Sequence, residues 1–225
     1  MKKSTITALS ILSLLVLFNQ VWAQNNNTDK ENIVFQLEEE RLAHDVYVAL
    51  GEKYDINAFA HIQEAEQRHF DMLLDLAEQR NMKIPAAVRK GKPGVYKNKD
   101  LQKAYDEMVK EGQTSLVAAL KVGAKIEEMD IKDLQESIAT TTDEATLEVY
   151  QYLLNGSENH LRAFTRNLKK QNIDYQPVIL EQAQFDKIIA GENKCGGQGQ
   201  KAACCDKGGK GKGKAKGGCC SKATE

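Results

Sequence analysis

Cysteine is absent from the first 194 residues of this 225-residue chain, because all five cysteines lie between Cys195 and Cys220. No disulfide can therefore join two parts of the main body. Proline is scarce, with three residues, and the alternation of apolar and polar residues that is typical of strands is not evident anywhere. The sequence therefore predicts a mainly α-helical protein that is held together by its apolar core.

Long apolar runs are also absent, except at the start of the chain. Met1-Lys2-Lys3, an apolar run from Ile6 to Phe18 and a small residue at Ala23 have the charged start, apolar middle and small-residue end of a secretory signal. We expect cleavage after Ala23 and a secreted or periplasmic protein, with no stable membrane insertion after cleavage. The alternative is a retained membrane anchor, which the run disfavours because it is shorter than the ~20 residues of a spanning helix.

The net charge of −1 hides two unlike regions. Residues 24–190 carry 21 Lys and Arg against 29 Asp and Glu, a net charge of −8, whereas the last 35 residues carry 8 Lys against 3 acids. The acidic body argues against nucleic acid as a partner, and its surface could attract cations. Residues 191–225 are rich in Gly, Lys and Cys and are predicted to be disordered. Their thiols could capture a soft metal or cross-link to another chain, or could be incidental.

Apolar residues recur at helical spacing in four long segments. Asn57 is a suitable cap for the second, Thr114 or Ser115 for the third, and Thr141 with Glu144 forms a capping box for the fourth. The first two predicted helices span Ile33 to Tyr54 and Asn57 to about Asn81. The third follows its cap at Thr114 or Ser115, with a core line from Val117 to Ile138, and the fourth runs from the capping box to about Gln171.

The segments between and around these helices complete the predicted domain organisation. Residues 24–32 are polar and are predicted to be a disordered leader, and residues 33–175 to form one helical domain. About thirty residues, with a short helix from Asn98 to Lys110, join the second and third helices, and an accessory helix lies in residues 176–190, from about Val178. Since such a connection is too long for a tight turn, the fold class predicted is a ferritin-like four-helix bundle with a long crossover.

Glu66 and His69 are the most informative pair in the sequence. They are three residues apart on the apolar stripe of the second helix, so they project from one face and can bind one metal ion together. Burying a lone carboxylate costs several kcal/mol, and coordination by a metal is one way to offset this. The pair therefore predicts a metal site that needs further ligands from other helices.

Each of the other helices offers a candidate ligand. Glu40 is favoured in the first helix because Tyr47 lies two turns along the same face, where its phenol can bond a ligand carboxylate from the opposite helix. Glu127 interrupts the apolar line of the third helix, with Glu128 as the alternative, and His160 lies on the inner line of the fourth.

Three further positions bear on the ligand set. Asp130, one turn after Glu127, is placed to orient a histidine. His44 flanks a charged face and His61 lies at the start of the second helix, away from the apolar stripe, so both are predicted not to be ligands. Carboxylates with one histidine for each ion suit iron or manganese, although zinc or copper could occupy the same site. The sequence therefore predicts a di-iron or di-manganese centre.

The fourth helix departs from the expected pattern. A second Glu-x-x-His would place glutamate at position 157, which is serine. Gly156 and Ser157 leave space for water or an exogenous ligand, so the second ion could be weakly held or absent.

The segments that carry these residues are Glu38–Tyr47, Ala65–His69, Gly123–Ile131 and Gly156–Phe164. Together they resemble an uncharacterised bacterial family of ferritin-like domains, over residues 34–168. That family has no settled function. Its wider similarity to rubrerythrin and ferritin implies a dinuclear site on Glu40, Glu66, His69, Glu127 and His160.

Three functions follow from this reasoning. The leading prediction is an exported ferritin-like metal-binding protein with an oxidase or peroxidase activity, in which a reduced di-metal site reacts with oxygen or peroxide. The second is a periplasmic metal store or carrier without turnover. The third is a non-catalytic helical interaction module with a degenerate site. Metal ions are the predicted partners, and assembly into a homo-oligomer is left open.

Overall fold

The computed structural model describes residues 8–191, with side chains from Asp29 onward. Over these residues the chain forms seven helices and no strand, which confirms the predicted all-α class. The helices are α1 (Ala8–Lys53), α2 (Asn57–Gln79), α3 (Ala86–Arg89), α4 (Lys99–Gly112), α5 (Leu116–Thr140), α6 (Glu144–Lys170) and α7 (Gln182–Ala190).

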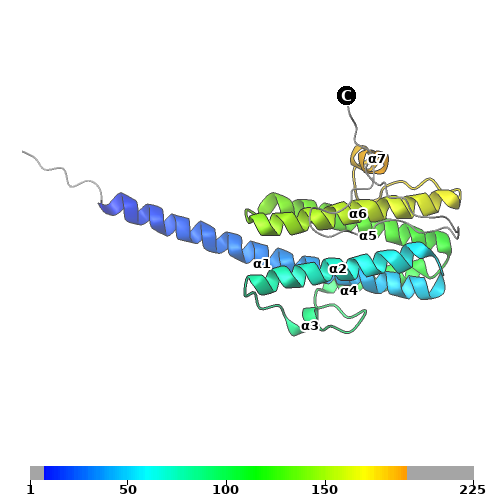
Figure 1. Ribbon diagram of the computed structural model, residues 1–225, viewed down its shortest axis with the longest axis horizontal. Coiled ribbons are helices and arrows are strands. Elements are labelled where there is room, and N and C mark those ends of the chain that lie inside the picture. The colour runs from blue at the N-terminus through cyan, green and yellow to red at the C-terminus, as the bar shows by residue number, and fades with distance from the viewer. Residues whose placement is uncertain (1–7, 192–225) are drawn as a thin grey trace, which may run out of the picture.

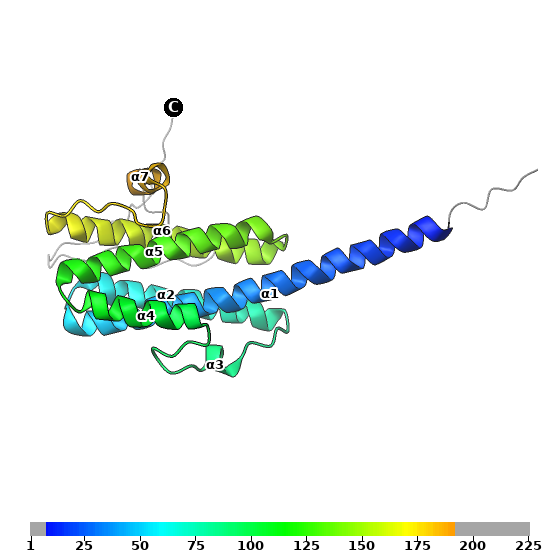
Figure 2. The same cartoon turned by 180° about the vertical axis from the view of Figure 1, so that it is seen from behind.

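Four long helices pack in a ring, in which α1 contacts α2, α2 contacts α6, α6 contacts α5 and α5 contacts α1 (Figure 1). Only three residues join α1 to α2 and α5 to α6, so each of these pairs is antiparallel. The helices α2 and α5 run in the same direction, and the chain must therefore return along the body between them. Residues 80–115 make that return through α3 and α4, and α4 packs on α1 and α5 (Figure 2).

The ends of the helices follow local side-chain chemistry. The Ser115 hydroxyl accepts a hydrogen bond from the backbone N–H of Ala118 and caps α5, as predicted. The predicted capping box of α6 is wrong, because Asp143 is the cap and accepts from the N–H of Thr146. The predicted cap of α2 is also wrong, since Asn57 is its first helical residue. Asn81 ends α2 in the left-handed conformation, which asparagine tolerates.

The helix α1 begins at Ala8, well before the predicted start at Ile33. Residues 24–32, predicted to be a disordered leader, are helical in the structure. They contain no proline or glycine to end a helix, and Asp29 and Ile33 are already buried. The first half of α1 projects beyond the other helices (Figures 1 and 2). Cleavage after Ala23 stays a prediction. Within the described residues, no helix combines the length and apolar character needed to cross a membrane.

The apolar core is divided into two clusters along the bundle axis. On each of the four long helices, one stretch of buried residues belongs to one cluster, the next stretch belongs to the other, and polar candidate ligands lie near the boundary. The first cluster includes Val46, Tyr47, Phe59, Leu120, Leu161 and Phe164, and the second includes Ile33, Leu37, Leu73, Leu134, Tyr150 and Leu153. Each fully buried side chain of this kind contributes about 1.5–3 kcal/mol, so two apolar clusters can support the burial of charged groups between them.

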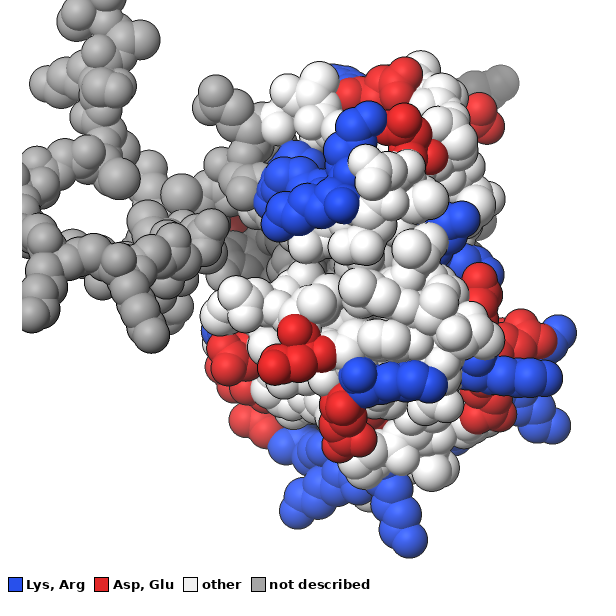
Figure 3. All heavy atoms as spheres, turned by 90° about the vertical axis from the view of Figure 1, so that its right-hand side faces the viewer, with Lys and Arg blue, Asp and Glu red and all other residues white. Residues whose placement is uncertain are grey.

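The end of the molecule that carries the turn between α1 and α2 is seen in Figure 3. On this face groups of Lys and Arg alternate with groups of Asp and Glu, and uncharged residues separate them. The acidic surplus of residues 24–190 is therefore not gathered at this end.

Candidate metal centre

The five predicted ligands converge between the two apolar clusters, although they come from four different helices. They form two groups that share Glu66, and within each group the ligand atoms lie within 4.8 Å of one another. The groups are Glu40, Glu66 and His69, and Glu66, Glu127 and His160. The i, i+3 spacing on α2 places Glu66 and His69 on one face, as the sequence predicts.

Glu66 is the centre of the arrangement, because each of its two oxygens faces a different histidine. Its Oε2 lies 2.9 Å from Nδ1 of His69, and its Oε1 lies 2.9 Å from Nδ1 of His160. Despite these short distances, neither Glu66 oxygen has hydrogen-bond geometry to any partner, and Nδ1 of His160 has none either. Atoms that approach closely but are misdirected for hydrogen bonds are arranged as ligands of a shared cation would be.

Two further carboxylates complete the groups. An oxygen of Glu40 lies 3.2 Å from Nδ1 of His69, and an oxygen of Glu127 lies 3.4 Å from Nδ1 of His160. Glu66 and Glu127 are fully buried and Glu40 is 1% exposed, while the His160 side chain, at 12%, is the most exposed of the five. The site is therefore closed to bulk water on most sides.

Burial raises the pKa of Glu40 to about 7, with Glu66 adding to the rise and His69 opposing it. Burial also raises the pKa of Glu127 to about 7, with repulsion from Glu66, while His160 and Tyr47 oppose the rise. Glu66 behaves in the opposite way: burial would raise its pKa, but the two histidines lower it well below the ordinary value. Glu66 thus carries the most firmly fixed negative charge of the site.

The histidines provide the balancing charge. Burial alone would lower the pKa of His69, but Glu40 and Glu66 raise it to about 10. The pKa of His160 is raised in the same way by Glu66 and Glu127. Protons on two imidazoles therefore offset three carboxylates, and a metal ion that binds these nitrogens must displace those protons.

Tyr47 positions Glu127. Its hydroxyl donates to Oε1 of Glu127 at 2.5 Å and lies 3.3 Å from the carbonyl oxygen of Gly123. This confirms the prediction that the Tyr47 phenol bonds a carboxylate from the opposite helix. Burial and the nearby carboxylates raise the pKa of Tyr47 well above its ordinary value, so the phenol keeps its proton and remains a donor.

Glu128, the alternative to Glu127, belongs to neither group. Its carboxylate accepts a hydrogen bond from the Tyr175 hydroxyl at 2.6 Å and from three consecutive backbone N–H groups, those of Val178, Ile179 and Leu180. These bonds hold residues 175–180 in a non-helical conformation. The accessory helix therefore begins at Gln182, later than the predicted start at Val178.

The space predicted beside Gly156 and Ser157 is filled. A Cβ at Gly156 would lie 2.5 Å from Cε1 of His69, so the missing side chain makes room for the imidazole and not for water or an exogenous ligand. Ser157 is fully buried and its hydroxyl donates to the carbonyl oxygen of Leu153 at 3.3 Å. The rings of His69 and His160 stack with centroids 5.6 Å apart.

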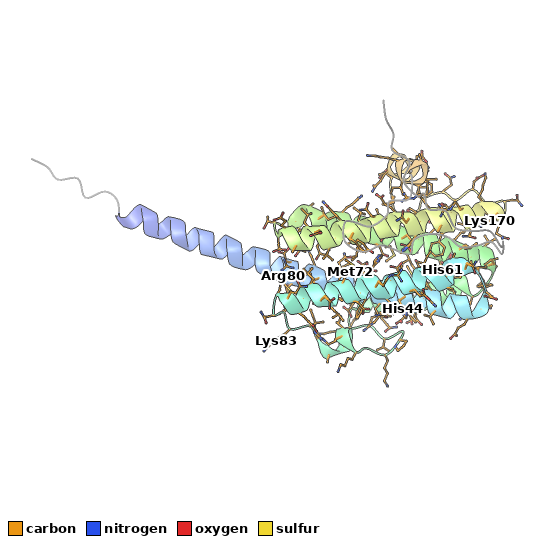
Figure 4. All side chains as sticks on the ribbon, in the orientation of Figure 1. His44, His61, Met72, Arg80, Lys83 and Lys170 are labelled. Atoms are coloured by element: carbon orange, nitrogen blue, oxygen red, sulfur yellow. The ribbon has the colours of Figure 1, made fainter. Side chains whose placement is uncertain are left out.

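The other two histidines, His44 and His61, belong to neither group; their positions on the ribbon are labelled in Figure 4. Nδ1 of His44, on α1, lies 3.1 Å from the Asp45 carboxylate, and His61, near the start of α2, is exposed. Asp130 was predicted to orient a histidine, but its Oδ2 is buried and lacks a hydrogen-bond partner.

Two acidic residues beside the site are not among the predicted ligands, and one of them, Glu39, was not identified from the sequence. Glu39 is 3% exposed and Asp130 is 4% exposed, and both have pKa values raised by burial and by neighbouring acids. Asp130 lies three residues after Glu127, a spacing that predicts a shared helix face. No comparable signal distinguished Glu39 within Glu38-Glu39-Glu40.

Comparisons with known proteins agree over the region that carries the site. The family described as an uncharacterized protein domain, DUF2202, matches residues 29–192. The uncharacterized protein MJ0754 of Methanocaldococcus jannaschii is 39% identical over 168 residues, which cover 75% of this chain and 90% of that protein. The crystal structure of hypothetical protein MJ0754 aligns with a TM-score of 0.70 at 38% identity, covering 73% of this chain and 93% of the other. Neither name states an activity.

Proposed function

This chain belongs to the DUF2202 family, and we propose that its function is to hold two metal ions between α1, α2, α5 and α6. The observation that carries the proposal is the arrangement of Glu66, whose two oxygens each lie 2.9 Å from a different histidine without hydrogen-bond geometry. One carboxylate shared between two ligand groups is the arrangement that a dinuclear site requires.

The donor atoms fit such ions. Each group offers carboxylate oxygens and one imidazole nitrogen, a set that suits iron or manganese. Zinc and copper have high affinity for the same donors and are the expected competitors. Four buried atoms of the site, the two oxygens of Glu66, Oε2 of Glu127 and Nδ1 of His160, lack a hydrogen-bond partner. An unpaired buried polar group costs about 1–3 kcal/mol, which a bound cation would offset.

We propose further that the domain is a ferritin-like bundle with a long crossover. Two observations support this assignment: the order in which the four long helices contact one another around the ring, and the return of residues 80–115 along the body. The Glu-x-x-His pair of α2 supports it as well. Position 157 is serine, where a second Glu-x-x-His pair would have glutamate. Glu66 is therefore the carboxylate that the two groups share.

The proposed activity is an oxidase or peroxidase reaction. A reduced pair of iron or manganese ions would supply electrons to oxygen or peroxide. The protein's own residues would fix the ligand positions: Glu66 would bind both ions, Glu40 and His69 one of them, and Glu127 and His160 the other. Tyr47 would orient Glu127 through its hydrogen bond, and the apolar clusters would exclude water.

Export is part of the proposal. The charged start and apolar run of residues 1–23 support a signal peptide. Cleavage after Ala23 would remove much of the part of α1 that projects beyond the other helices.

Elemental analysis of the purified protein tests the metal proposal. We expect two ions per chain in the wild type and a loss of both in Glu66→Gln, because this residue belongs to both groups. Glu40→Gln and Glu127→Gln should each weaken the binding of one ion. The control is Glu64→Gln, which removes the same charge from an exposed position of α2. Equal metal content in the Glu66→Gln and Glu64→Gln variants would refute the proposal.

Activity is tested separately, on protein loaded anaerobically with Fe²⁺. An oxidase or peroxidase should consume oxygen or hydrogen peroxide over many turnovers with an added reductant. Stable uptake of two ions without turnover would instead identify a metal store or carrier.

A further inference from the structure

A row of acidic side chains leads from the surface to the proposed metal site between α1 and α5. Its members are Glu39 on α1 and Asp130 and Asp133 on α5, and these two helices lie side by side (Figure 2). The Asp133 side chain is 24% exposed, whereas Glu39 and Asp130 are almost fully buried. The row therefore begins at solvent and continues into the interior.

The buried members of the row have no hydrogen-bond donors. Both carboxylate oxygens of Glu39 and Oδ2 of Asp130 are inaccessible to water and accept no hydrogen bond from an N–H group. The side chain within hydrogen-bonding reach of Glu39 is another carboxyl, that of Asp133. Buried polar groups are normally paired, and a buried carboxylate without a partner is the most unfavourable kind. Neither Glu39 nor Asp130 has a backbone N–H group bonded to these buried oxygens.

The charges of the row act on one another in order. Burial raises the pKa of Glu39 first, followed by repulsion from Asp133 and then from Glu40. Burial also raises the pKa of Asp130, followed by repulsion from Glu127, Glu40 and Glu39. The helix spacing gives the row its direction: on α5, Asp133 lies one turn from Asp130 and Asp130 lies one turn from Glu127, so the three carboxyls follow one face. On α1, Glu39 is within hydrogen-bonding reach of Asp133 and directly precedes Glu40.

A basic side chain stands beside the outer end of the row. Lys132 is half exposed and pairs with Asp133 at 3.5 Å and with Glu136 at 2.7 Å. It lowers the pKa of Glu39 only as the last of the causes. The inner members therefore face other acids rather than a cationic side chain.

We propose that Glu39, Asp130 and Asp133 form the path by which divalent cations reach the buried site. A partly dehydrated cation needs successive oxygen ligands where water is excluded, and carboxyl groups one helical turn apart on α5, with Glu39 beside them on α1, supply them. A line of one sign of charge with apolar walls also concentrates counter-ions and accelerates their arrival. Among the described residues, the groups of three ligand atoms within 4.8 Å include Glu40 and Glu127, at the inner end of the row, and no member of the row itself.

This inference rests on the proposed function, and its test separates the two. Metal-free full-length protein is mixed with Co²⁺ in a stopped-flow instrument, and the visible absorption of the bound ion reports loading without oxygen chemistry. Equilibrium dialysis then gives the final number of ions. Wild-type protein that binds no Co²⁺, Fe²⁺ or Mn²⁺ would overturn the proposed function itself.

The path is tested with Glu39→Gln and Asp130→Asn, which keep the size of each side chain. We expect both variants to reach the wild-type number of ions but to load about 10-fold more slowly, and raised salt should slow the wild type more than the variants. The matched control is Glu107→Gln, on α4, which removes one charge from an exposed side chain and should load at the wild-type rate.

Two results would overturn the path. Unchanged loading rates in both variants would place the route elsewhere, for example past the partly exposed His160. A variant that folds, as circular dichroism reports, but holds fewer ions at equilibrium would make the substituted residue a ligand and not a member of the path.

Discussion

Replacing Gly156 by alanine should lower the affinity for one of the two proposed ions and leave the affinity for the other unchanged. A Cβ at this position would lie 2.5 Å from Cε1 and 2.6 Å from Nε2 of His69, whereas carbon atoms in contact are normally about 3.5–4.0 Å apart. The imidazole must therefore move by about 1 Å. Ligand distances in metal sites are held to about 0.2 Å, so this displacement takes Nδ1 out of a binding position.

The magnitude follows from the overpacking. Inserting a methyl group into a packed interior costs about 1–3 kcal/mol. If the bound ion must oppose this strain to recover its ligand, its dissociation constant should rise about 5- to 150-fold. Glu66, Glu127 and His160 do not contact the new methyl group, so the second ion should keep its affinity.

Gly123→Ala is the matched control. Its Cβ would lie 2.5 Å from Cε1 of Phe164, an equally close clash with a residue that is not a ligand. Both variants should lower the free energy of unfolding by about 1–3 kcal/mol in the metal-free state. Only the Gly156→Ala variant should show one tight and one weak Co²⁺ site in a titration.

The reasoning would be refuted if the Gly156→Ala variant bound both ions with wild-type affinity. It would also be refuted if the weakened ion proved to be the one held by Glu127 and His160, which a second titration in the Glu127→Gln background would reveal.

Three other substitutions have defined outcomes. Ser157→Ala should leave the metal content unchanged by elemental analysis, since its hydroxyl is bonded to the Leu153 carbonyl and is not a ligand; loss of an ion would contradict this. Glu128→Gln should lower the free energy of unfolding by about 1–3 kcal/mol in urea denaturation, with the metal retained, because the uncharged amide oxygen binds the backbone N–H groups more weakly and the amide nitrogen cannot accept from the Tyr175 hydroxyl. Asp45→Asn should destabilise the protein at neutral pH but less at low pH. Burial would raise the pKa of Asp45, but hydrogen bonds from His44, Tyr96 and the Gly94 N–H lower it below the ordinary value of an aspartate. The stabilisation by ionised Asp45 is therefore fully present above that ordinary pKa. It is lost as the pH falls through the lower pKa of the folded state. Urea denaturation at several pH values measures the free energy of unfolding of both proteins. A difference between Asp45→Asn and wild type that stays constant with pH would contradict the prediction.

Much of the fold was predictable because local patterns specify it. Apolar spacing located the four long helices, and the length of residues 80–115 predicted that α2 and α5 are not joined by a tight turn. Helix ends were less certain, because several polar residues compete for each cap. At α6 the choice between Thr141 and Asp143 depended on backbone conformation, which the sequence does not state.

The sequence by itself determined which side chains could meet: the i, i+3 spacing placed Glu66 and His69 on one face, and a glutamate in an apolar line singled out Glu127. Tertiary structure alone decided what each group faces. Glu127 and Glu128 are neighbours on α5, yet one faces His160 while the other binds the backbone of residues 178–180, because the helix turns by about 100° per residue. Only packing between helices placed His69 in the space left by Gly156, and only the approach of α1 to α5 left Glu39 and Asp130 buried among other acidic side chains. These contacts join residues far apart in the chain, so no local pattern encodes them.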